Sequence, residues 1–160
     1  MPGQFAVGHL SFTPVATALL APFRTIFTYR NLRDSLISFL RWEESTGRDA
    51  DRTKDWKDLP DAPAKVLIFM QDLGAFYLNW CASIVGWISH AGIYRCGFEQ
   101  LIGDYGPKPQ REYLRDIFEF TGVSGPEPDW DVVLGRVIGA RTMTWSGSRT
   151  DRNVFWDDEV

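Results

Sequence analysis

The stretch Phe27-Thr28-Tyr29-Arg30-Asn31-Leu32-Arg33-Asp34-Ser35-Leu36-Ile37-Ser38-Phe39 joins an apolar strand to a capped helix, with an arginine at the junction. Residues 25–29 are all β-branched or aromatic, which favours a buried strand of a parallel sheet. Asn31 is a good helix N-cap, and Asp34 stands three residues later, where a capping-box acid would stand. The pattern therefore predicts a strand that ends at Tyr29 and a helix that begins just after Asn31.

Arg30 stands at the carboxyl end of this predicted strand. Ligands of open α/β sheets collect at that edge, and a planar guanidinium there suits a two-point grip on phosphate oxygens. Ser38 lies seven residues after Asn31, two turns along the helix on the same face. We expect Arg30 and Ser38 to hold one phosphate group. A plain surface ion pair is the alternative role for Arg30.

The rest of the chain alternates between strand and helix patterns. Strands are expected at 5–10, 25–29 and 93–98, and helices at 15–20, 33–42, 64–89 (one long helix or a broken pair), from about Pro109 to Gly122, and 132–138. This order predicts an α/β protein with a parallel sheet flanked by helices, in one domain over residues 1–160. The polar segment 43–63 is expected at the surface, either as a solvated connection or as a lid over a site.

Apolar residues recur at three- and four-residue spacing in the long helical segment, so they are expected to face the core: Val66, Met70, Leu73, Tyr77, Trp80, Ile84 and Trp87. Trp42 and Trp145 lie outside this stripe, and their rings are placed to stack on an aromatic ring of a ligand. His90, near the end of this segment, is expected to be only a partner of the helix dipole.

Composition excludes several classes of function. A net charge of −4 argues against general binding to nucleic acids or anionic membranes. The segment 73–94 lacks charged residues, but it contains polar residues such as Asn79 and also three glycines. No membrane span is therefore expected. Two cysteines without a C-x-x-C pair, and no secretory signal pattern, indicate a cytoplasmic protein. No metal is expected, because no His, Cys, Asp or Glu grouping has metal-ligand spacing.

The Arg30–Ser38 segment resembles the 3'-phosphate-binding segment of the PAPS-dependent sulfotransferases, where PAPS is 3'-phosphoadenosine 5'-phosphosulfate. In that family the strand ends in Arg, then Asn or Asp, then Arg/Lys-Asp, with Ser four residues after the Asp. Four further blocks in the same order resemble family motifs. They are Gly8-His9-Leu10 followed by Thr13-Pro14, Gly97-Phe98-Glu99-Gln100-Leu101, the helix 113–123, and Thr144-Trp145-Ser146-Gly147-Ser148-Arg149 leading to Trp156.

The resemblance implies a P-loop NTPase-like sulfotransferase fold, with PAPS as the co-substrate and a small molecule or glycan as the acceptor. By the same resemblance, a sulfuryl group passes from PAPS to an acceptor hydroxyl or amine, with His9 as the catalytic base. Arg30 and Ser38 then bind the 3'-phosphate, and the loop of Thr144, Trp145, Ser146, Gly147, Ser148 and Arg149 closes on the cofactor. A structural role is the alternative for His9, and Arg141 and Arg152 compete with Arg149.

The chain departs from the family in two respects. The Gly/Thr-rich loop for the 5'-phosphosulfate precedes the histidine motif in the family, but only eight residues precede His9 here. We therefore expect a sulfotransferase domain that is incomplete at its amino terminus and that self-associates or takes the missing unit from a partner chain. Phe98 also replaces the usual tyrosine. A catalytically inactive nucleotide-binding or assembly module is the alternative function.

Overall fold

A computed structural model describes residues 7–46, 56–138 and 153–156. The chain divides into two compact units. Unit 1 comprises Met1–Arg30 and Cys81–Gly139, and unit 2 comprises Asn31–Trp80 and Ala140–Val160. The boundary at residue 80 falls inside a long helix, so each unit contains part of it.

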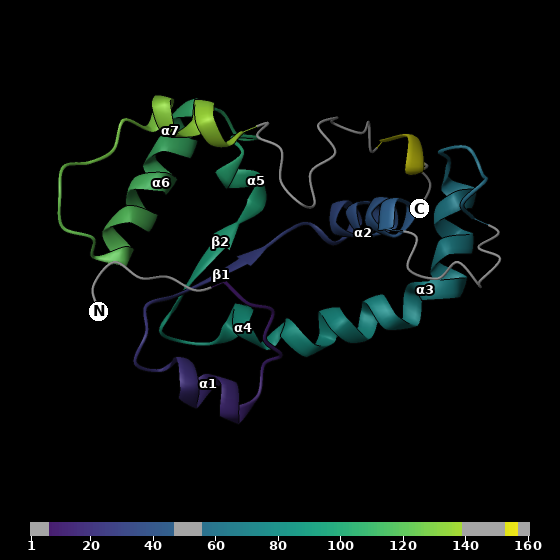
Figure 1. The fold of residues 1–160 in the computed structure, drawn as a ribbon, viewed down its shortest axis with the longest axis horizontal. Helices are drawn as coiled ribbons and strands as arrows, with labels where there is room; N and C mark the ends of the chain where they lie inside the picture. Colours follow the sequence, from purple (N-terminus) through teal and green to yellow (C-terminus); the bar gives the residue numbers. More distant parts are fainter. Residues whose placement is uncertain (1–6, 47–55, 139–152, 157–160) are drawn as a thin grey trace. The chain divides into compact units, whose positions relative to one another are not determined.

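Unit 1 is built on two parallel strands, β1 (Thr25–Tyr29) and β2 (Ile93–Gly97), which pair from Thr25↔Ile93 to Tyr29↔Gly97 (Figure 1). Its helices are α1 (Pro14–Leu20), α4 (Gly86–Ser89), α5 (Phe98–Leu101), α6 (Pro107–Thr121) and α7 (Trp130–Val137). The expected α/β class with a parallel sheet and flanking helices is confirmed. The bounds of β1 agree with the sequence prediction, and β2 ends one residue earlier than expected.

The strand expected at 5–10 is wrong over its described part, because residues 7–10 belong to no strand. The backbone at residues 10 and 12 is bonded instead to the last turn of α3 and to α4. The indole N–H of Trp87 donates to the Leu10 carbonyl at 2.9 Å, and the Phe12 N–H donates to the Ser83 carbonyl at 2.6 Å. The Phe12 ring packs edge-on against Trp87, with centroids 5.0 Å apart, in space that a side chain at Gly86 would fill. Residues 10–12 are thus held against the end of α3 and against α4, and we call this segment the strap.

Helix α6 ends as its sequence predicts, with Gly122 as its C-cap, but it begins at Pro107, two residues before the expected start near Pro109. Gly122 has φ +65°, a conformation that residues with a Cβ adopt at a cost. The Arg24 guanidinium lies against it and donates from Nη1 to the Phe120 carbonyl at 2.7 Å. One arginine therefore satisfies a carbonyl at the end of the helix and ties α6 to the start of β1.

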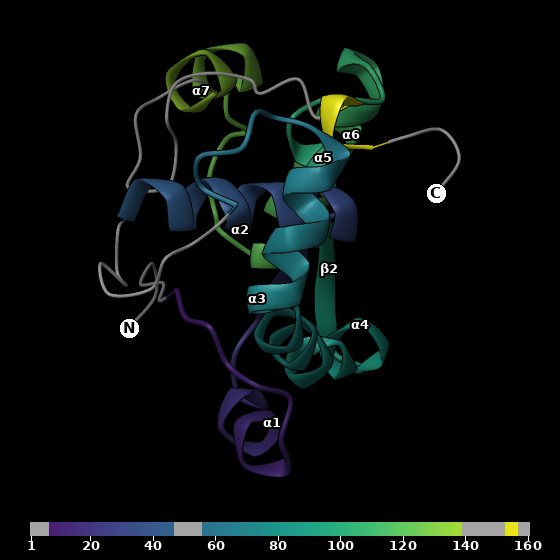
Figure 2. The ribbon, with the colours of Figure 1, turned by 90° about the vertical axis from the view of Figure 1, so that its right-hand side faces the viewer.

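Unit 2 contains α2 (Leu32–Thr46), the larger part of α3 (Pro63–Ile84) and the 3-10 helix η1 (Asn153–Phe155) (Figure 2). The N-cap prediction is confirmed, since Asn31 Oδ1 accepts from the Arg33 N–H at 2.9 Å. Tyr77 joins the two long helices by donating from its hydroxyl to the Leu32 carbonyl at 3.0 Å. The hydrophobic core of the described part of this unit consists of Leu36, Ile37, Leu40, Trp56, Val66, Phe69, Tyr77 and Phe155.

In the described part of the polar segment 43–63, residues 43–46 and 56–63, two side chains are more buried than the polarity of the segment predicts. Helix α2 continues to Thr46, Glu43 is buried, and Trp56 is only 1% exposed. The Trp56 ring packs edge-on against Phe69 at 4.9 Å, and its N–H donates to Asp72 Oδ2 at 3.2 Å. The Trp56 side chain therefore holds the residues just before α3 against that helix.

Two basic side chains join the end of α2 to the start of α3. Lys65 is buried and forms ion pairs with Glu44 and with Asp61 (3.5 Å), and it donates to the Leu59 carbonyl at 3.1 Å. Arg41 forms ion pairs with the same two carboxylates. Burial opposes the ionisation of Asp61, but the hydrogen bond and charge of Arg41 outweigh it and lower the pKa of that carboxyl. This network keeps the buried Lys65 charge compensated.

The long helical segment is a broken pair, with α3 and α4 separated at Val85. Trp87 is buried as predicted, whereas Trp80 is 39% exposed, which contradicts its predicted burial. Tyr77 already contacts Leu32, the first residue of α2, so Trp80 lies one turn beyond the end of its partner helix. None of the described helices is long and apolar enough to cross a membrane.

Replacing Gly122 with alanine should destabilise the protein by about 1–2 kcal/mol, because a Cβ is unfavourable at positive φ and would displace the Arg24 guanidinium. Gly135→Ala is the matched control, since Gly135 lies inside α7 with nothing within 4 Å of an added Cβ. That change should instead stabilise the helix by about 0.5–1 kcal/mol. Urea denaturation measures both. Equal effects of the two substitutions would contradict the assigned C-cap.

Candidate functional site at the carboxyl edge of the sheet

The parallel register of β1 and β2 brings Arg30 next to Phe98 and Glu99. Tyr29 and Gly97 are paired, so the residues that follow them leave the sheet at the same edge. Arg30 follows β1, while Phe98 and Glu99 begin α5 directly after β2. We call Arg30, Phe98 and Glu99 the sheet-edge cluster.

The Arg30 guanidinium lies over the Phe98 ring, with its carbon 4.2 Å from the ring centroid. Its Nε is 3.9 Å from Glu99 Oε1, and the two side chains are 18% and 19% exposed. The cation–π contact holds the guanidinium without using an N–H donor. Glu99 balances its charge at a distance longer than a direct hydrogen bond. The cluster thus presents a positioned and partly accessible cation.

Tyr113 of α6 fixes the end of β2 behind this cluster. Its hydroxyl accepts from the Gly97 N–H at 2.7 Å and donates to the Arg95 carbonyl at 3.0 Å. Burial raises the pKa of Tyr113 well above its ordinary value, so the phenol keeps its donor proton. Burial also raises the pKa of the Cys96 thiol, which lies between the two bonded residues. Cys96 is therefore a structural core residue.

The predicted site residues fall in different parts of the structure. Arg30 belongs to unit 1, and Ser38 is an exposed residue of α2 in unit 2. Trp42 lies in the same helix and stacks on Phe39. The predicted loop of Thr144, Trp145, Ser146, Gly147, Ser148 and Arg149 lies outside the described residues.

His9, the predicted base, is exposed and precedes the strap. The next residue, Leu10, is bonded to Trp87, whose ring lines a pocket with Thr25 and Ile93. Thr25 and Ile93 are the first residues of the two strands, whereas Arg30 follows the last residue of β1, about 16 Å further along. The strap is therefore anchored at the edge of the sheet opposite to Arg30.

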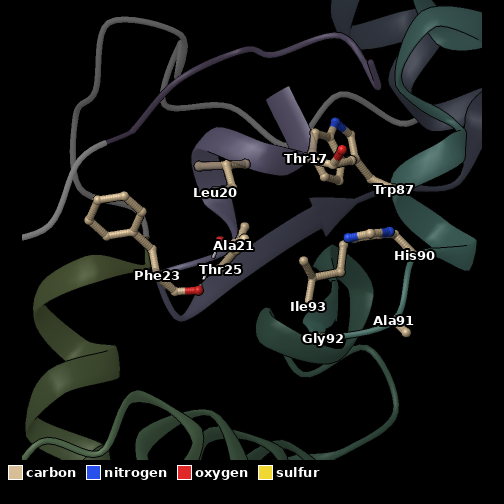
Figure 3. A pocket seen from close by; sticks show the side chains of 10 residues that line it. All are labelled: Thr17, Leu20, Ala21, Phe23, Thr25, Trp87, His90, Ala91, Gly92 and Ile93. Carbon is tan, nitrogen blue, oxygen red and sulfur yellow. Dashed lines mark hydrogen bonds between the residues drawn. The ribbon is translucent and has the colours of Figure 1, made fainter. Parts of the chain in front are cut away.

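That pocket is itself a feature that the sequence did not predict. It opens at the amino ends of β1 and β2, between α1 and α4 (Figure 3). His90 lines it beside Trp87, with ring centroids 5.7 Å apart. The only sequence signal was the three-residue spacing of these two rings, which is equally typical of a buried helix face.

Comparison with models of protein families, with curated proteins and with solved structures gave no match for this chain. Within the described residues, no group of His, Cys, Asp and Glu side chains could hold a metal ion.

Tyr113→Phe should destabilise unit 1 by about 1–3 kcal/mol, because the Gly97 N–H would lose its acceptor and the Arg95 carbonyl its donor. The folded-state pKa of Tyr113 is raised above the ordinary tyrosine pKa of about 10. The stabilising effect of the hydroxyl should thus be complete below that pH and lost as the pH rises through the folded-state value. Urea denaturation at several pH values measures this difference. Tyr105→Phe, at an exposed tyrosine, is the control, and equal losses for both variants would contradict the role of Tyr113.

Proposed function

We propose that the sheet-edge cluster binds the 3'-phosphate of a phosphorylated adenosine nucleotide, and that the chain is a PAPS-dependent sulfotransferase or the carboxyl-terminal part of one. The observation that carries this proposal is the position of Arg30. Its guanidinium follows a parallel strand, lies against Phe98 and has the Glu99 carboxylate beside it. The carboxyl edge of a parallel sheet is where α/β proteins bind nucleotides.

Arg30 has the chemistry that a phosphate site needs. A guanidinium presents its N–H donors in a fixed plane and can bond two phosphate oxygens at once. The Phe98 contact limits its rotation, so less side-chain entropy is lost on binding. Glu99 compensates the charge when no anion is present, and a phosphate has to compete with that carboxylate. In this proposal Ser38 and the loop 144–149, Arg149 above all, complete the phosphate site.

Sulfuryl transfer needs a cation clamp on the donor and a base for the acceptor proton. PAPS would supply the sulfuryl group, and a hydroxyl or amine of a small molecule or glycan would accept it. The resemblance assigns the base to His9. We also propose a cytoplasmic protein that associates with a second copy or a partner chain carrying the 5'-phosphosulfate loop.

One observation favours a second candidate function, a catalytically inactive nucleotide-binding module. The strap that follows His9 is anchored through Trp87 at the amino ends of the strands, whereas the proposed phosphate site lies at their carboxyl ends. An inactive module would keep Arg30 and need no base near it. Turnover of labelled PAPS in the presence of a partner chain separates the two functions. In an enzyme, His9→Ala should lower turnover by roughly 10²- to 10⁴-fold.

Adenosine 3',5'-bisphosphate should raise the melting temperature of the chain more than adenosine 5'-phosphate does, because only the first carries a 3'-phosphate. Arg30→Ala should remove this difference, with a loss of about 1.5–3 kcal/mol in binding free energy for a charge-assisted contact. Glu99→Gln should strengthen binding of the bisphosphate, because it removes the competing carboxylate. Thermal shift and calorimetry measure these effects.

Arg111→Ala is the matched control for this test. Arg111 is also a unit 1 arginine paired with a carboxylate, but it pairs with Asp131 on α7 and is half exposed. Its loss should leave binding of the bisphosphate unchanged. Equal shifts with the two nucleotides, or an Arg30→Ala protein that is folded and binds normally, would refute the phosphate site.

A further inference from the structure

The pocket at the amino ends of the strands is a separate concave site of unit 1. It has a volume of about 190 Å³ and lies between α1, α4 and the first residues of β1 and β2 (Figure 3). Its wall includes Leu20, Phe23, Ile93 and the ring of Trp87. Because it lies at the opposite edge of the sheet from Arg30, it is independent of the proposed phosphate site.

The aromatic wall of this pocket is held in place by the strap. The Trp87 N–H is bonded to the Leu10 carbonyl, so Trp87 offers the pocket only its apolar ring. Phe12 contacts both Trp87 and His90 edge-on, with centroids 5.0 and 5.7 Å away. These contacts fix the direction of the imidazole, which reaches from the end of α4 toward Ile93 in Figure 3.

Three side chains give the pocket its hydrogen-bonding capacity: His90, Thr17 and Thr25, whose hydroxyl donates to the Phe23 carbonyl at 3.5 Å. Within the described part of the chain, the ring nitrogens of His90 have no hydrogen-bond partner, and its interactions are the two aromatic contacts and its backbone bond. The Thr17 hydroxyl donates to the Pro14 carbonyl at 2.9 Å, which leaves its oxygen able to accept. Among the described residues that line the pocket, none is Lys, Arg, Asp or Glu. A charged ligand would lose its hydration here without a Lys, Arg, Asp or Glu side chain to compensate it, so the described wall favours a neutral ligand.

We propose that this pocket binds a small neutral ring compound that carries one hydroxyl group. The ring would pack against Trp87 and Leu20, and the hydroxyl would bond to the imidazole of His90. An apolar cavity of about 150 Å³ holds a benzene molecule, so a volume of this size accommodates a single substituted ring. Polar groups that converge beside aromatic and aliphatic side chains are typical of small-molecule sites.

The test adds benzyl alcohol, toluene or benzoate to the full chain. Binding of each probe is detected by the NMR chemical shifts of the backbone amides and of the His90 imidazole. Benzyl alcohol should shift the resonances of Gly92, Ile93 and His90. It should bind about 2- to 10-fold more tightly than toluene, the range expected for one neutral hydrogen bond. Benzoate should not shift these resonances. No pocket shifts with benzyl alcohol, or tighter binding of benzoate, would overturn the proposal.

Two variants separate the hydroxyl contact from the cavity. His90→Phe keeps a ring for the contacts with Phe12 and Trp87 and should bring the ratio of the benzyl alcohol and toluene affinities to about one. Ala21→Phe, at a small lining residue, should weaken binding of both probes by filling the pocket. Ser89→Ala, on the same helix as Trp87 but not in the lining, should change neither. An unchanged ratio in His90→Phe, or unchanged binding in Ala21→Phe, would exclude this site.

Discussion

The parallel pairing of β1 with β2 is the constraint on which the rest of unit 1 depends. The register from Thr25↔Ile93 to Tyr29↔Gly97 defines two edges with different chemistry. The carboxyl edge carries the sheet-edge cluster, with a cation held on an aromatic ring and balanced by a carboxylate. The amino edge carries the neutral pocket. A shift of one residue in this register would separate Arg30 from Phe98 and would also open the wall of the pocket.

Side chains from outside the sheet hold this pairing in place. Tyr113 bonds two backbone groups of β2, and Arg24 joins the start of β1 to the end of α6. These contacts matter because only Ala16, Trp87 and Cys96 are buried hydrophobic residues in the described part of unit 1. Ile26 and Tyr29 of β1 remain over a third exposed, although parallel sheets are usually covered on both faces. This exposure supports the proposed association with a second chain.

The elements that the sequence predicts best are those specified by local interactions. The apolar run of β1, the Asn31 cap and the end of α6 at Gly122 each depend on residues within a few positions of one another. Non-local contacts explain the errors. The chain around residue 10 is bonded to Trp87, 77 residues away, rather than to a neighbouring strand. Likewise, Trp56 is buried by Phe69 although its own segment is polar. The strand pattern predicts that Arg30 lies at the carboxyl end of β1. Its contact with Phe98 could not be predicted in this way, because it depends on the register between β1 and β2.

Phosphorus NMR tests most directly whether Arg30 binds a 3'-phosphate. In this experiment adenosine 3',5'-bisphosphate is titrated with the protein. The nucleotide carries two phosphates with separate resonances, so each reports its own environment. We expect the 3'-phosphate resonance to shift and broaden before the 5'-phosphate resonance. With the Arg30→Ala protein we expect no such change. A response confined to the 5'-phosphate, or one that persists without the Arg30 guanidinium, would contradict the proposed phosphate site.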